Sequence, residues 1–182
     1  MKNLTAILAV LMMIFAGLAC STDETDKANA MVDEANKFIT EGNKNVQDAE
    51  TKGKEYNQKI TASEGDEDLA KVTEYGKTEL LPLYDKMKDN FQKAGEKFDA
   101  ASKLKVNEKF KEYLEIKASE FKKRADYAEA LKAVPKTLAD GNYKEPAQKD
   151  LDKADGILKE ANDLDTKAKK IQTDNPNIFK KG

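Results

Sequence analysis

The sequence has no histidine, no tryptophan and only one cysteine, Cys20, among its 182 residues. Histidine is the side chain that most often serves as a general base or metal ligand near neutral pH. A single cysteine excludes an intramolecular disulfide and any zinc or iron–sulfur site that needs several thiolates. We therefore expect a protein that is not an enzyme and that holds neither a metal nor a cofactor.

Arginine is almost missing as well, because Arg124 is the only arginine among 32 basic residues. The 34 acidic residues leave a formal net charge of −2, and the two signs are interleaved along the chain. Lysine is a solvated point charge, whereas the planar fork of arginine suits bidentate phosphate recognition. With no strong field of one sign either, we expect no nucleic-acid partner.

Long apolar runs are confined to residues 4–18, which read LTAILAVLMMIFAGL and follow Lys2 and Asn3. Fifteen residues are fewer than the roughly 20 that a helix needs to span a bilayer, but they match the apolar core of a signal peptide. The character changes directly after Cys20, where Ser21 and Thr22 lead into an acidic stretch. We expect residues 1–19 to be a signal peptide.

The end of this run, Gly17-Leu18-Ala19-Cys20, resembles the lipobox of bacterial prolipoproteins. The resemblance implies cleavage between Ala19 and Cys20 and attachment of lipid to Cys20, which would fix the protein to a membrane. Gly17 departs from the box, which usually has leucine three places before the cysteine. An aspartate after the cysteine would suggest inner-membrane retention, and Ser21 stands there instead. The family analogy thus favours the outer membrane in a cell that has two membranes.

Beyond residue 20, apolar residues recur at steps of three and four, which places them on one face of each of several helices. Four such stripes occupy residues 31–60, 69–101, 106–138 and 147–171. Short connections between long helices favour antiparallel neighbours. The sequence therefore predicts an all-α fold, an elongated antiparallel four-helix bundle with up-down-up-down topology. We expect a lipidated tether at residues 20–26, the bundle at 27–173 and a C-terminal tail at 174–182.

Local signals support these helices. Residues 62–66 and 140–143 are predicted breaks, Asn107 is a predicted N-cap, and Pro146 suits a first helical turn. Many acidic and basic residues stand four apart, including Glu120 and Arg124, and such pairs are typical of solvated helix faces. In the tail, Ile178 and Phe179 are expected either to cover one end of the bundle or to engage a partner.

Three features are candidates for function. The most apolar run of the predicted bundle, Leu81-Pro82-Leu83-Tyr84 with Leu80 before it, is a candidate docking knob or a segment packed around a proline kink. Glycines inside the stripes either open a ligand cavity or let helices approach a bulky side chain. The densest basic cluster comprises Lys117, Lys122, Lys123 and Arg124, and we expect a solvated helix face there more than a lipid or polymer site.

Two functions fit these features. The first is a membrane-anchored envelope lipoprotein whose helices act as a non-catalytic structural or protein-interaction bundle, with an envelope protein or the cell wall as partner and with self-association possible. The alternative is a carrier that holds a small apolar molecule or lipid between its helices. A carrier needs an apolar cavity lined by side chains such as Phe38, Phe91 and Phe98.

Overall fold

The computed structural model of the chain describes residues 23–139 and 145–179, and all its regular structure is helical. Cys20 and the predicted signal peptide lie outside the described residues, as does the predicted break at 140–143. The elements are α1 (Thr25–Ala62), α2 (Asp66–Tyr75), η1 (Gly76–Leu80), α3 (Leu81–Ser102), α4 (Glu108–Leu131), α5 (Ala133–Ala139) and α6 (Glu145–Asp174). The predicted all-α helical bundle is confirmed.

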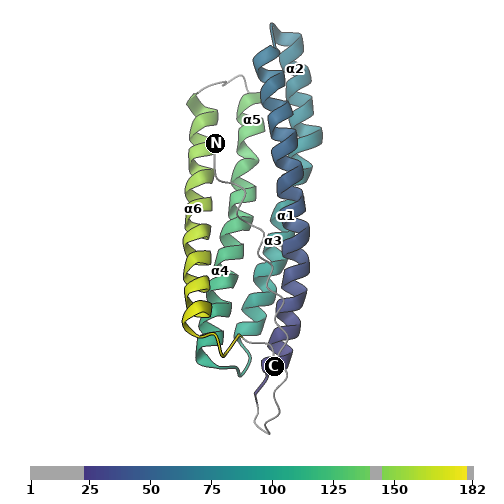
Figure 1. The fold of residues 1–182 in the computed structure, drawn as a ribbon. Helices are drawn as coiled ribbons and strands as arrows, with labels where there is room; N and C mark the ends of the chain where they lie inside the picture. The colour runs from purple at the N-terminus through teal and green to yellow at the C-terminus, as the bar shows by residue number, and fades with distance from the viewer. Residues whose placement is uncertain (1–22, 140–144, 180–182) are drawn as a thin grey trace.

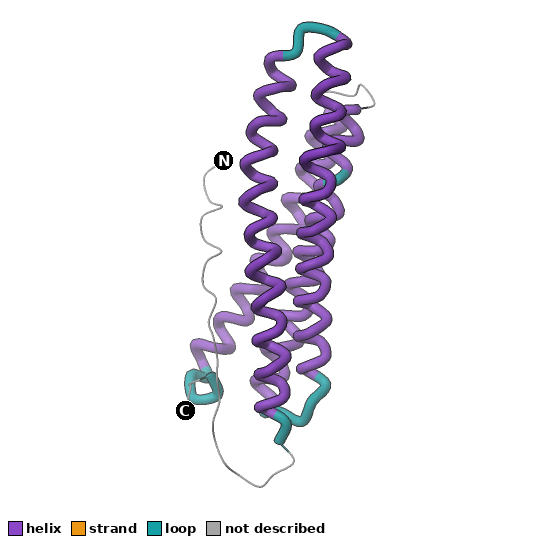
Figure 2. The backbone as a smooth tube through the Cα atoms, turned by 90° about the vertical axis from the view of Figure 1, so that its right-hand side faces the viewer, coloured by secondary structure: helices purple, strands orange, loops and turns teal. Residues whose placement is uncertain are grey.

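The helices form an elongated bundle in which successive long segments run in opposite directions (Figure 1). Helix α3 packs against α1 on one side and α4 on the other, and α6 packs against α4. In the described part of the chain, α1 and α6 make no comparable contact with each other. The long helices are therefore arranged in a row, and the pair α3 and α4 forms its centre (Figures 1 and 2).

The aromatic part of the core lies along α3, between α1 on one side and α4 on the other. The Phe121 ring lies 5.6 Å from that of Phe98 and 6.0 Å from that of Phe91, centroid to centroid. A Cβ atom at Gly42 would stand only 2.6 Å from the Phe91 ring. Gly76 likewise faces the Tyr56 ring. At these two positions glycine admits a bulky neighbour, as one of the two alternatives predicted.

The second predicted helix contains a π-helical turn, η1, between α2 and α3. Pro82 has no N–H and its ring would clash with the carbonyl of Thr78 in a regular helix. The chain avoids this conflict by widening the preceding turn, in which the Leu81 N–H donates to the Gly76 carbonyl five residues back. The predicted interruption at Pro82 is therefore confirmed, as a π-turn within a continuous helical segment.

The third predicted helix is divided, because α4 ends at Leu131 and α5 begins at Ala133. Pro135 explains the division, since a proline removes the hydrogen bond to the carbonyl four residues earlier, here that of Leu131. The start of α4 agrees with the prediction. The side chain of Asn107 accepts a hydrogen bond of 2.8 Å from the Lys109 N–H, and so caps the helix.

Helix α6 turns a strict heptad of alanines toward the rest of the bundle. Its buried side chains are those of Ala147, Ala154, Ala161 and Ala168. The chain then folds back, and the Phe179 ring meets those of Phe110 and Tyr113 edge-on at 5.9 and 5.0 Å. The tail therefore covers one end of the bundle, which decides between the two alternatives for Phe179. No helix within the described ranges is both long enough and apolar enough to cross a membrane.

Candidate functional site

Most of the predicted docking segment, residues 81–84, packs against neighbouring helices of the bundle. Tyr84 is buried, Leu81 and Leu83 are half-buried against the core, and only Pro82 is exposed. The side chains that would engage a partner thus already pack on neighbouring helices. Docking at this segment stays a prediction.

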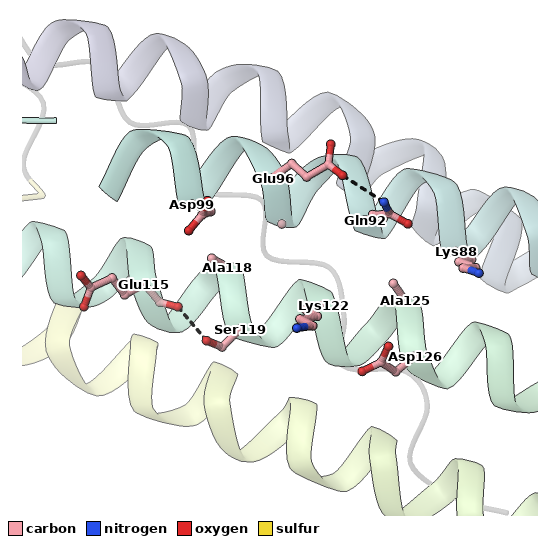
Figure 3. A pocket seen from close by; sticks show the side chains of 11 residues that line it. Lys88, Gln92, Glu96, Asp99, Glu115, Ala118, Ser119, Lys122, Ala125 and Asp126 are labelled. Atoms are coloured by element: carbon pink, nitrogen blue, oxygen red, sulfur yellow. Dashed lines mark hydrogen bonds between the residues drawn. The ribbon is translucent and has the colours of Figure 1, made fainter. Parts of the chain in front are cut away.

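A groove of about 620 Å³ lies on the outer face of the central helix pair. Because it runs between α3 and α4, we refer to it as the α3/α4 groove (Figure 3). The structure assigns it eleven lining residues: Lys88, Gln92, Gly95, Glu96, Asp99, Glu115, Ala118, Ser119, Lys122, Ala125 and Asp126. Charged side chains form its two walls and small side chains its floor.

The floor exists because α3 and α4 come very close together at Gly95. A Cβ atom added there would lie 3.3 Å from the Ala118 carbonyl oxygen and 3.4 Å from the Lys122 amide nitrogen. Ala118 and Ala125, seven residues apart on α4, extend the same line of small side chains. Helices approach each other this closely only where side chains are small. The glycine therefore explains why the outer face is hollowed.

One end of the groove is acidic. Figure 3 shows Asp99 on α3 and Glu115 on α4 at this end, and Glu96, about one turn along α3, with its carboxylate directed toward Gln92. Asp99 pairs with Lys103 of its own segment at 2.5 Å, and Glu96 accepts a hydrogen bond from Gln92. Neither Glu96 nor Glu115 forms an ion pair with any residue that the structure describes. No cation therefore bridges the two helices at this end.

The other end of the same helix pair is closed by ion pairs. Lys88 of α3 meets Glu129 of α4 at 2.9 Å, and Lys132, just after α4, meets Asp85 at 2.7 Å.

Cross-helix ion pairs also join the other long helices. They are Lys97–Glu34 between α3 and α1, and Lys123–Glu160 and Lys117–Asp165 between α4 and α6. At the acidic end of the groove, no such cross-helix ion pair forms between the described residues. Lys122, in the middle of the groove, also has no ion-pair partner among the described residues.

A second charged cluster is buried between α4 and α6. The Glu120 side chain is 1% exposed and accepts a hydrogen bond of 2.8 Å from Arg124 Nε and another from Lys117. Lys117 also meets Asp165 of α6 at 3.2 Å, and the Arg124 guanidinium donates to Asn162 at 3.4 Å. The expectation that Glu120 and Arg124 lie on a solvated face is wrong, because α6 covers them. A spacing of four residues predicts that the two side chains pair, but it does not predict which face of α4 another helix covers.

The predicted basic cluster is consequently dispersed over different surfaces. Lys117 and Arg124 are in the buried cluster, Lys123 pairs with Glu160 on α6 at 2.6 Å, and Lys122 lines the groove. These four cations do not form a continuous basic patch. The arrangement therefore does not support a binding site for an anionic lipid or polymer at these residues.

Three tyrosines pack against the core, Tyr84 buried and Tyr113 and Tyr127 partly buried. Burial raises the pKa of Tyr84 to about 12, and the neighbouring Tyr127 adds to the effect. Burial likewise raises the pKa of Tyr127 to about 12, with Asp155 of α6 and Glu50 of α1 contributing. The pKa of Tyr113 is raised further, again chiefly by burial. These phenols are neutral near pH 7 and serve as packing groups.

Only part of the groove could be recognised from the sequence. Gly95 is one of the glycines inside helices for which the sequence left open a ligand cavity or a close helix approach. Its neighbour Ala118, however, comes from another helix. The lining carboxylates look like any other exposed acids when each helix is considered alone. Their shared position depends on the register between α3 and α4, which no local sequence signal specifies.

Comparison with known proteins adds no relative. No protein-family model, curated protein or solved structure matches the chain. The functional argument therefore rests on the sequence and on the geometry described above.

Proposed function

We propose that the protein is a lipid-anchored component of the bacterial envelope whose helical bundle acts as a non-catalytic interaction module. The leader and the lipobox-like residues around Cys20 support the anchor. Helix α1 begins at Thr25, so few residues separate it from Cys20. Five extended residue steps span about 16–18 Å. A bundle on so short a tether works beside the membrane.

The observation that carries the proposed interaction is the α3/α4 groove, where Glu96, Glu115 and Lys122 have no ion-pair partner among the described residues. Each interface between long helices carries at least one cross-helix ion pair, namely Lys97–Glu34, Lys88–Glu129 and Lys123–Glu160, whereas none forms between described residues at the acidic end of the groove. Charges left unpaired around a hollow surface are available to a second molecule, for which they provide orientation and specificity.

Binding of an apolar cargo is less well supported. Phe91 and Phe98, which a carrier would use to line a cavity, are 2% and 1% exposed and pack on Phe121. Phe38 is half-buried, with the Lys93 ammonium 5.7 Å from the centre of its ring. The α3/α4 groove is rimmed by charges, whereas sites for apolar molecules are lined mostly by apolar side chains. The geometry therefore favours an interaction surface over a carrier.

The groove also lies toward the end of the bundle that the tether would hold. The Glu24 N–H donates to the Lys105 carbonyl at 2.8 Å, which ties the start of α1 to the turn that follows α3. Asp99 is close to that turn, and its carboxylate would be repelled by anionic lipid head groups. A protein therefore fits this surface better than the membrane itself.

The anchor is tested by labelling cells of the native host with a fatty-acid probe. We expect the wild-type protein to be labelled and to sediment with membranes. A Cys20→Ser variant should lose both properties, whereas Ser21→Ala, which keeps the thiol, should retain them. An unlabelled wild-type protein that fractionates like Cys20→Ser would overturn the proposed anchoring.

The interaction is tested in the same cells with a photo-crosslinking residue at Ser119 in the groove. The matched control has the same residue at Lys153, an exposed position on α6. We expect a discrete crosslinked product at Ser119 but not at Lys153. Equal products at both positions, or none at either, would count against an interaction at the groove.

A further inference from the structure

We infer that the α3/α4 groove binds a cationic amphipathic helix of a partner protein. This inference rests on the proposed interaction function and names the chemistry of the partner. It follows from the shape of the groove floor and from the arrangement of charges along the walls.

The shape fits a helix. Two antiparallel helices form the walls, and Gly95, Ala118 and Ala125 form a floor without large side chains. A third helix can place a ridge of side chains in such a groove, because ridges of one helix pack into the grooves of others. An amphipathic helix in an exposed groove is also an established mode of peptide recognition.

The charges select a basic helix. Four carboxylates and two ammonium groups line the groove. Lys88 is already engaged by Glu129, and Asp99 by Lys103. Among the described residues, the lining groups without an ion-pair partner are therefore the carboxylates of Glu96, Glu115 and Asp126 and the ammonium group of Lys122. A cationic helix gains attractive contacts with this excess of unpaired carboxylates.

The positions of the charges define the partner further. Lys122 of α4 lies at the level of Gly95 on α3, because its amide nitrogen would stand 3.4 Å from a Cβ atom at that glycine. Gly95 and Asp99 are four residues apart on α3, which corresponds to about 6 Å along the helix axis. A complementary helix would carry two lysines or arginines one turn apart for the acidic end and an acidic residue about four positions away for Lys122. Alanine or another small residue would face the floor.

A second copy of the same chain fits less well. Two such grooves placed face to face would bring together twice as many carboxylates as ammonium groups. Their floors are both hollow, so neither copy would supply the ridge that fills the other. The groove is therefore better suited to a different protein.

A synthetic helix provides the test. The probe is a peptide of three heptads with an alanine stripe, two lysines one turn apart and a glutamate four positions away. Its binding to the purified protein, residues 21–182, is measured by fluorescence anisotropy at low and high salt. A second peptide, in which glutamates replace the two lysines, controls for charge.

The protein variant removes the acidic end through Glu96→Gln, Asp99→Asn and Glu115→Gln. A matched control removes three carboxylates elsewhere, through Asp66→Asn, Glu67→Gln and Asp68→Asn at the start of α2. Each variant has the same net charge, and circular dichroism checks that both are folded. We expect the groove variant to bind the basic peptide about tenfold more weakly. The control should bind within about twofold of wild type, and salt should weaken the wild-type complex.

Several results would overturn the inference. Equal binding by the two variants would show that only net charge matters, and tight binding of the glutamate peptide would exclude a cationic ligand. A wild-type dimer that the groove variant dissociates would identify a second copy as the occupant. If the peptide fails to bind while Ser119 still crosslinks to a protein, the interaction function stands and only the chemistry of the partner is wrong.

Discussion

Arg124, the sole arginine of the chain, donates from Nε to the carboxylate of Glu120 at 2.8 Å, one turn away on the same helix. Both side chains are buried under α6, where the guanidinium also reaches Asn162. A buried carboxylate has to be paired and hydrogen-bonded, because removing its charge from water is strongly unfavourable. The pair therefore requires α6 to be in place with Asn162 and Asp165 at the correct level.

This arrangement predicts a non-additive response to mutation. Glu120→Leu leaves Arg124 with little more than Asn162, and we expect a loss of about 3–5 kcal/mol in the free energy of unfolding. Arg124→Met should cost less, because Lys117 still pairs with Glu120. The double variant should be more stable than the sum of the two losses predicts. Urea unfolding of all four proteins measures the coupling, and simple additivity would contradict the buried pair.

Gly42 and Gly53 lie on the same helix, but we expect alanine substitutions at the two positions to change the free energy of unfolding in opposite directions. Gly42→Ala would place Cβ 2.6 Å from the Phe91 ring, so we expect a loss of about 1–3 kcal/mol. Gly53 has no neighbour within 4 Å of such a Cβ. Gly53→Ala should therefore stabilise the protein by about 0.5–1 kcal/mol through helix propensity. Thermal unfolding of both variants tests the contrast, and a shift of equal sign would refute it.

Asp165 predicts loss of stability in acid. Its burial raises its pKa, but Lys169 and Lys117 outweigh this effect and hold the pKa below its ordinary value. A carboxyl group with a depressed folded-state pKa stabilises the fold above its unfolded pKa of about 4 and loses this contribution as the pH falls through the folded value. Asp165→Asn should therefore reduce the dependence of stability on pH below about 4. Asp163→Asn, at an exposed position on α6, is the control for the loss of one negative charge.

The tyrosines predict the opposite behaviour in base. The pKa of both Tyr84 and Tyr127 is raised to about 12, chiefly by burial. A raised folded-state pKa means that the stabilisation is complete below the unfolded value of about 10 and is lost as the pH rises from 10 through 12. Absorbance at about 295 nm should show these phenols ionising late or together with unfolding. Tyr84→Phe should lessen the alkaline loss of stability, and ordinary titration of every tyrosine near pH 10 would be inconsistent with their burial.

The helices were predictable because their signals are local. The recurring apolar stripes identified the helical segments, Asn107 marked the start of α4, and Pro82 marked an interruption. The break after Leu131 was not predicted, although Pro135 carries the same physical signal as Pro82. Each of these features depends on residues within about one turn of each other, which a single sequence contains.

Features that depend on how helices align were not predictable in the same way. The burial of Glu120 and Arg124 requires α6 to cross α4 at one level. The groove needs Gly95 of α3 beside Ala118 of α4. In both cases the partner residues are far apart in sequence, and hydropathy alone assigns charged side chains to solvent. Cys20 and its predicted lipid belong to the part of the chain that the structure does not describe.

The alanine heptad of α6 affects the order in which the helices unfold. A methyl group contributes roughly 0.8 kcal/mol on burial, so four alanines supply about 3 kcal/mol, far less than the phenylalanines between α1, α3 and α4. The larger apolar side chains of α6, including Leu158, Leu164 and Ile171, are only partly buried. We therefore expect α6 to be the least stable of the long helices, with the ring of Phe179 packed at one end of the bundle beside it. In a hydrogen-exchange experiment, its amides should gain deuterium before those of α3, and Phe179→Ala should widen that gap.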